Sequence, residues 1–189
     1  MIFMATRCAV TFAEGGDTRQ RLAQALCRAS LDACGLTVVE LCGDPRPRFG
    51  EMLRAAREHA GEWFAWVNGD CQLLLPPESI NCTAIDVLGM RRVEVGAGTI
   101  CAGVDGYLIR SAFWDACLSS DVPEMWVGAS HVDWWLSRAA QKFGRYAETV
   151  CLAHLPHERT ATSLGTDRFG AENIANYEAW ADRHGVSKC

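Results

Sequence analysis

The chain has 189 residues, which is enough for one hydrophobic core of ordinary size and short for two. Hydrophobic residues make up 49% and charged residues 22%, a composition that excludes an intrinsically disordered chain. The formal net charge is -5 and the basic residues are scattered, so nucleic acid is not an expected partner.

The 10 cysteines do not follow the pattern of a disulfide framework or a zinc site. The chain opens without a signal-peptide pattern, holds no apolar run of membrane-spanning length, and has no Cys-x-x-Cys pair. We therefore expect a cytoplasmic protein with reduced thiols, several of which serve as small hydrophobic side chains: Cys27, Cys34, Cys71 and Cys151.

The first third of the chain alternates predicted strands and helices. Residues 7–13 and 36–41 are short apolar runs typical of buried strands. Asp17 is placed to cap a helix between them, which ends at Gly35. The apolar stripe expected to face the core in that helix is Leu22, Ala25, Leu26, Ala29 and Ala33.

A second helix over residues 49–60 stops at Gly61 and leads into the apolar run 63–67. That run is short and aromatic, so it predicts a central strand that ends in Asn68-Gly69-Asp70. Strand–helix alternation of this kind predicts an α/β fold in three layers, with a mostly parallel central sheet and helices on both faces.

The second half of the chain is less regular. We expect a short helix over residues 76–88, loop and edge strand over 96–106, and a strand over 104–110. Ser111 and Ser130 are predicted helix caps, and Gly144 is the expected end of the second of these helices. A strand over residues 147–153 then leads to His154, and residues 171–185 predict a closing amphipathic helix. The whole chain, 1–189, is predicted to be one domain.

Asn68 and Asp70 are the first candidates for chemistry, because ligands bind beyond the carboxyl ends of parallel strands. Their oxygens suit Mg²⁺ or Mn²⁺, and the intervening glycine lets the backbone approach closely. The alternative is an ordinary Asn-Gly turn in which Asp70 is a cap.

His154 and His157 are the second candidates. Pro156 keeps the chain between them out of helical geometry, and side chains three apart on an extended chain point to opposite sides. We expect one of them to be a metal ligand, with His154 preferred; the alternative is a satisfied interior histidine and a surface histidine.

Asp133 is the third candidate, because a carboxylate at a helix start can act as a general base on a hydroxyl. Trp134 beside it is the tryptophan expected to be exposed as a platform for a sugar ring. The spacing from Ser130 to Asp133 is also that of a capping box, which by itself would explain the residue.

Asp105, Arg91 and Arg92 are weaker candidates for substrate binding. Asp105 can meet a sugar or acceptor hydroxyl, and the arginines can meet a diphosphate. The alternative interpretation is a turn residue and a solvated pair of charges.

The order of these motifs resembles the GT-A-type nucleotide-sugar glycosyltransferases, over roughly residues 5–160. Asn68-Gly69-Asp70 is similar to their Asp-x-Asp metal motif, with asparagine in its first position. Residues 126–136, which include Asp133, are similar to their acceptor loop and acidic helix start. The strand that ends in His154 is similar to the one that carries a metal-binding histidine.

The resemblance implies a nucleotide-binding half over residues 1–75 and an acceptor and catalytic half over 76–160. It implies transfer of a sugar from a nucleotide-sugar donor to an unknown acceptor, with Mn²⁺ or Mg²⁺ at Asp70 and His154 and with Asp133 as the base. Two alternatives stay open. One is a non-catalytic sugar-, nucleotide- or protein-binding module of the same fold; the other is a metal-dependent hydrolase with Asp70, Asp133, His154 and His157 as ligands.

Overall fold

The computed structural model describes residues 7–10, 18–40, 46–58, 60–75, 80, 82–157 and 167–188. Its strands are β1 Arg7–Val10, β2 Thr37–Glu40, β3 Trp63–Val67, β4 Cys71–Leu73, β5 Val87–Glu94, β6 Ile100–Arg110 and β7 Tyr146–His154. Its helices are α1 Thr18–Ala33, α2 Phe49–Arg57, α3 Ser111–Phe113, the π-helical turn η2 Trp114–Leu118, α4 Val132–Phe143 and α5 Arg168–His184.

The strands form one mixed sheet in the order β2-β1-β3-β6-β5-β7-β4. The pairs β1·β2, β1·β3 and β5·β7 are parallel, whereas β3·β6, β5·β6 and β4·β7 are antiparallel. The α/β class is therefore confirmed, but the expected mostly parallel sheet is wrong. The reason lies at residues 95–99, where Gly96 and Gly98 adopt positive φ angles of 91° and 67° and turn the chain back as a hairpin.

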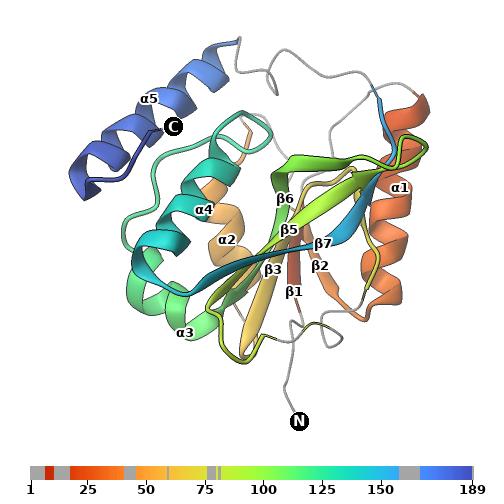
Figure 1. Ribbon diagram of the computed structural model, residues 1–189, viewed down its shortest axis with the longest axis horizontal. Coiled ribbons are helices and arrows are strands. Elements are labelled where there is room, and N and C mark those ends of the chain that lie inside the picture. The colour runs from red at the N-terminus through yellow and green to blue at the C-terminus, as the bar shows by residue number, and fades with distance from the viewer. Residues whose placement is uncertain are drawn as a thin grey trace.

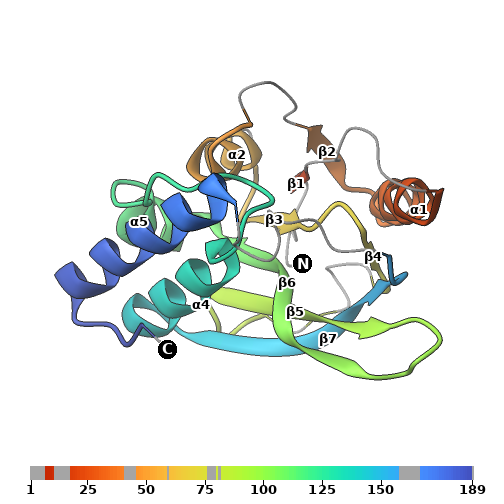
Figure 2. The ribbon, with the colours of Figure 1, turned by 90° about the horizontal axis from the view of Figure 1, so that it is seen from above.

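Helices cover both faces of this sheet, as expected (Figure 1, Figure 2). α1 lies over one face, where Cys27 and Leu31 join a buried cluster with side chains of β3, β4 and β7. α2, α3 and α4 lie over the other face, and α5 packs outside them through Tyr177 and Trp180.

β3 is buried along its whole length, because it lies between the two layers of helices. Its side chains alternate between them: Phe64 and Trp66 belong to the cluster under α2 and α4, and Trp63, Ala65 and Val67 to the cluster under α1. The prediction of a central strand that ends just before Asn68 is confirmed, and so are the second helix and the closing helix.

The predicted core stripe of α1 is wrong by about one position. The helix buries Ala23, Cys27 and Leu31, whereas Leu22 is 50% exposed and Leu26 is 38% exposed. Both stripes have helical spacing, so periodicity alone does not fix which of them faces the sheet. The expected cap, Asp17, lies outside the described residues.

Residues 76–88 do not form the expected helix where the structure describes them. Thr83 and Ala84 lie in a turn, and Val87 and Leu88 already belong to β5. The region 96–106 also differs from expectation, because β6 is an interior strand between β3 and β5 rather than an edge. No helix in the described part of the chain has the length and apolar character needed to cross a membrane.

The cysteines whose side chains the structure describes are free thiols: Cys27, Cys34, Cys71, Cys82, Cys101, Cys117 and Cys151. Of those expected to act as small hydrophobic side chains, Cys27, Cys71 and Cys151 are buried and Cys34 is half-buried. Burial raises the pKa of both Cys27 and Cys151 to about 12, so these thiols stay protonated and unreactive at neutral pH.

Candidate functional site

Asp70 and His154 come together because of strand pairing. β4 begins directly after Asp70 and pairs antiparallel with β7, which places Cys71 opposite His154. On the other side of β7, the parallel strand β5 places Glu94 opposite the same histidine. The sheet register therefore gathers the ends of three strands around the His154 ring.

Asp70, His154 and His157 form a compact group whose candidate ligand atoms all lie within 4.8 Å of one another. Oδ2 of Asp70 is 3.0 Å from Nε2 of His157 and 3.5 Å from Nε2 of His154. Both histidines reach the carboxylate, although side chains three apart on an extended chain were expected to point to opposite sides; how many of them bind a metal stays a prediction. β7 ends at His154, so the alternation of an extended strand no longer applies to residues 155–157.

Asp70 and His154 each stabilise the charged form of the other. Burial alone would raise the pKa of Asp70, but hydrogen bonds and positive charge from His154 and His157 outweigh it and hold that pKa below its usual range. For His154 burial would lower the pKa, and hydrogen bonds to Asp70 and Glu94 raise it. The carboxylate is therefore ionised at neutral pH.

The donor set fits a divalent metal ion. One carboxylate oxygen and two imidazole nitrogens are ligands that manganese and zinc both accept. Nδ1 of His154 donates to Oε2 of Glu94 at 2.7 Å, so in the neutral imidazole the nitrogen available to a metal ion is Nε2, on the side of Asp70. A carboxylate behind a ligating histidine is the usual outer partner in metal sites.

Glu94 was missed in the sequence analysis. The available signal was its spacing from Arg92, since residues two apart on a strand share a face. Nε of Arg92 donates to Oε1 of Glu94 at 2.8 Å, and Nη1 of Arg92 is paired with Asp105. Arg92 thus joins two carboxylates, and its predicted contact with a diphosphate stays a prediction.

Asn68 and Asp105 lie side by side and are joined by two hydrogen bonds. The side-chain amide of Asn68 donates to Oδ1 of Asp105 at 2.9 Å, and the backbone N–H of Asn68 donates to the carbonyl oxygen of Asp105 at 2.8 Å. Asp105 is only 6% exposed. The amide of Asn68 is thus directed to Asp105, and its role as a metal ligand stays a prediction.

Asp133 lies in the first turn of α4, but not as part of a capping box. His131 is the residue before the helix, with a left-handed φ of 75°, and the Ser130 hydroxyl, buried, has no hydrogen-bond partner among the described residues. The predicted cap at Ser130 is therefore wrong, because the chain enters α4 one residue later. Burial, with a smaller contribution from Asp105, raises the pKa of Asp133 to about 6.

Trp134 and Arg91 differ in their surroundings. Trp134 is 45% exposed, and its ring lies 4.9 Å from the ring of His131. Arg91 donates through Nε and Nη2 to the carbonyl oxygen of Cys101 and lies 4.0 Å from Glu148. Arg91 and Arg92 therefore have different partners, as neighbours on a strand should.

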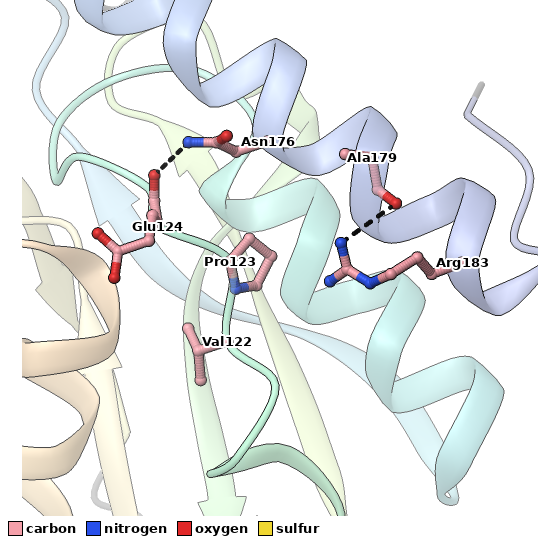
Figure 3. A pocket seen from close by; sticks show the side chains of 6 residues that line it. All are labelled: Val122, Pro123, Glu124, Asn176, Ala179 and Arg183. Carbon is pink, nitrogen blue, oxygen red and sulfur yellow. Dashed lines mark hydrogen bonds between the residues drawn. The ribbon is translucent and has the colours of Figure 1, made fainter.

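A cavity of about 230 Å³ lies elsewhere, between α5 and the segment that precedes residue 126 (Figure 3). Asn176 donates to the carbonyl oxygen of Glu124 across it at 2.6 Å. Its lining consists of Val122, Pro123, Glu124, Asn176, Ala179 and Arg183. None of the candidate site residues lines this cavity.

Comparison with known proteins identifies the fold. No protein-family model and no curated protein matches the chain. Among solved structures, residues 1–349 of Staphylococcus aureus TarS in complex with UDP-GlcNAc match with a TM-score of 0.60 at 11% identity, over 96% of this chain and 68% of that one. GalNAc-T7 with UDP, GalNAc and Mn²⁺ matches with a TM-score of 0.51 at 12% identity, over 96% of this chain and 50% of that one. The resemblance to GT-A-type glycosyltransferases is thus confirmed at the level of the fold.

Proposed function

We propose that this chain is a metal-dependent glycosyltransferase that uses a nucleotide-sugar donor. The observation that carries the proposal is the convergence of Asp70, His154 and His157 at strand ends of a GT-A-like sheet. UDP-GlcNAc bound to TarS, and UDP with Mn²⁺ in GalNAc-T7, give the class of ligand to test first. At identities of 11% and 12% the likeness is one of fold.

In this proposal Asp70, His154 and His157 hold Mn²⁺ or Mg²⁺, which when bound supplies positive charge to the diphosphate of the donor. Glu94 keeps the His154 ring in position through Nδ1. The chain itself is acidic, with a formal net charge of -5, and Arg92 is already paired with two carboxylates. Binding of a diphosphate at this site therefore needs the added cation.

Asp133 is the proposed general base. Its pKa of about 6 leaves it ionised at neutral pH and still basic enough to take a proton. The acceptor hydroxyl gives its proton to Asp133 as its oxygen forms a bond to the anomeric carbon and the bond from that carbon to the diphosphate breaks. The exposed ring of Trp134, one residue on, offers a face on which a sugar can stack.

The test is a screen of the purified chain for binding and turnover of nucleotide sugars with and without Mn²⁺. We expect Mn²⁺ with a nucleoside diphosphate to raise the melting temperature, because a ligand that binds the native state stabilises it. Asp70→Asn should abolish the shift, whereas Asp115→Asn, which removes a surface ion pair with Arg57, should preserve it. A flat response across uridine, guanosine, adenosine and cytidine diphosphates and their sugars would overturn the proposal.

The same screen separates the two alternatives. Binding of a nucleotide sugar without turnover, unchanged in Asp133→Asn, would identify a non-catalytic module. A tightly held zinc ion in the purified protein would favour a hydrolase. Within the described part of the chain, the compact ligand group holds Asp70, His154 and His157 without Asp133, one ligand fewer than that alternative assumed.

A further inference from the structure

We propose that Asp105 is a specificity-determining residue that accepts a hydrogen bond, through Oδ2, from a hydroxyl group of the sugar-nucleotide ligand. This inference rests on the proposed function and deepens it, because it gives the site a second anchor besides the cation ligands. It also assigns a role to Asp105, a carboxylate on β6. In the motif Asn68-Gly69-Asp70 the first position holds asparagine and not a carboxylate.

The two oxygens of Asp105 have very different surroundings. Oδ1 receives the Asn68 amide at 2.9 Å and is also paired with Nη1 of Arg92. Oδ2 is buried and has no hydrogen-bond partner among the described residues. The side chain of Asp105 as a whole is only 8% exposed.

A buried carboxylate oxygen without a partner is costly, typically by about 1–3 kcal/mol. Native proteins keep such an atom where a ligand or a bound water satisfies it. Here the carboxylate is held through Oδ1, which accepts from the Asn68 amide at 2.9 Å and is paired with Nη1 of Arg92. The atom is therefore prepositioned rather than free to turn toward another partner.

Asp105 is linked to both parts of the proposed site. Asn68, two residues before Asp70, donates to Oδ1 of Asp105, and Tyr107, two residues further along β6, donates to the backbone carbonyl oxygen of Asp133. Burial is the main cause that raises its pKa, and the negative charge of Asp70 adds to it. In the same way Asp105 adds to the burial that raises the pKa of Asp133. A ligand that contacts both Asp70 and Asp133 therefore comes close to Asp105.

The chemistry of the surroundings selects a neutral hydroxyl. An ionised carboxylate oxygen only accepts hydrogen bonds, so the ligand atom must be a donor. Arg92 is already paired with Asp105, so this carboxylate has a positively charged partner within the protein. Asp105 also stands outside the compact group of Asp70, His154 and His157 that is the candidate cation site. A ribose or hexose hydroxyl meets all three conditions.

The decisive experiment is titration calorimetry with saturating Mn²⁺ on the wild type and on Asp105→Asn, which replaces Oδ2 or its twin by an N–H₂ group. The probes are uridine diphosphate, its 2′-deoxy and 3′-deoxy analogues, and uridine diphosphate N-acetylglucosamine, with the guanosine series as a second set. Asp86→Asn is the matched control, because it also removes a carboxylate paired with arginine, at a distant place in the fold.

We expect Asp105→Asn to weaken nucleotide-sugar binding about tenfold, the loss of one hydrogen bond to a charged group. If the hydroxyl belongs to the ribose, the substitution also weakens the binding of uridine diphosphate. The variant then binds the corresponding deoxy analogue as tightly as it binds uridine diphosphate. If the hydroxyl belongs to the hexose, uridine diphosphate is unaffected and only the sugar conjugate weakens. The control should bind every probe as the wild type does.

Unchanged affinities in Asp105→Asn would overturn the inference and leave the proposed function standing. If the wild type binds none of the probes with Mn²⁺, the proposed function fails and the inference fails with it. Should Asp105→Asn not fold, Asp105→Glu keeps the charge beside Arg92 but shifts the oxygens, and the same loss is expected. A wild type that binds the deoxy analogues and the sugar conjugate exactly as it binds uridine diphosphate would also contradict the inference.

Discussion

Glu94 accepts a hydrogen bond from Nδ1 of His154 at 2.7 Å, across the parallel pairing of β5 and β7. The contact fixes which ring nitrogen of His154 faces Asp70 and so connects strand register with the ligand chemistry of the site. Because the two residues are 60 positions apart in sequence, only the folded sheet brings them together.

Glu94→Gln should weaken Mn²⁺ binding about tenfold, because the amide no longer holds the His154 imidazole with a charge-assisted bond. The measurement is Mn²⁺ titration followed by electron paramagnetic resonance of the free ion. Glu62→Gln is the control, since Glu62 is also paired with an arginine, Arg110, but at the opposite end of β3. Equal Mn²⁺ affinity in both variants would show that Glu94 does not support the ligand set.

The activity should rise with pH through a midpoint of about 6, the pKa of Asp133. Below that value the carboxyl is protonated and does not accept the proton of the acceptor. Rates measured from pH 5 to 8 at saturating donor and metal test this. Asp133→Asn should lower the rate by a factor of about 100 or more and remove this limb of the profile. A variant that keeps the wild-type profile would exclude Asp133 as the base.

The ionised carboxylate of Asp133 should also lower the free energy of unfolding of the protein. The folded-state pKa of Asp133, about 6, lies above the value of about 4 expected in the unfolded chain, so its ionised form disfavours folding. Asp133→Asn is therefore expected to stabilise the protein by about 2 kcal/mol at pH 7. The gain is fully present above pH 6 and is lost as the pH falls toward 4. Urea unfolding at pH 7 and pH 4.5 measures it, and a destabilised variant at pH 7 would contradict it.

Asp86 shows the opposite dependence on pH. It accepts from Nε and Nη2 of Arg145 at 2.9 Å each, and these bonds lead the causes that hold its pKa below the usual range. A lowered folded-state pKa contributes stability above the unfolded value, and that contribution is lost as the pH falls. Asp86→Asn should therefore cost about 1–2 kcal/mol at pH 7 and less below pH 4. A loss that does not change with pH would point to packing instead of charge.

The central strand, α2 and α5 could be predicted from the sequence because each has both an apolar pattern and a residue that marks its end. The run 63–67 is apolar throughout and ends in Asn68, and α5 ends at Gly185, whose φ of 60° suits glycine. The face of α1 was not predictable, because two neighbouring stripes share one period and only the sheet selects Ala23 and its companions. Periodicity fixes the type of an element and leaves its partner open.

The site was predictable only in part, for the same reason. Asp70 follows β3 and His154 is the last residue of β7, so their place at the carboxyl ends of strands could be expected from position alone. The reach of His157 depends on how the chain leaves β7, and the partnership of Asp105 with Asn68 depends on β6 running antiparallel beside β3. Neither the turn nor the strand direction leaves a spacing pattern in the sequence.

Gly106 lies directly after Asp105, where β6 pairs with the end of β3. A Cβ atom at Gly106 would lie 3.0 Å from the backbone oxygen of Trp66 and 2.9 Å from Cε of Met90, and the backbone atom has no room to move aside. Gly106→Ala should therefore cost about 1–3 kcal/mol and push β6 away from β3, which weakens ligand binding at the site. Gly103→Ala, in the same strand, is the matched control, because its Cβ meets nothing closer than Sγ of Cys101 at 3.8 Å. Chemical denaturation of both variants measures the difference, and equal stability would show that the two strands can separate at Gly106 without cost.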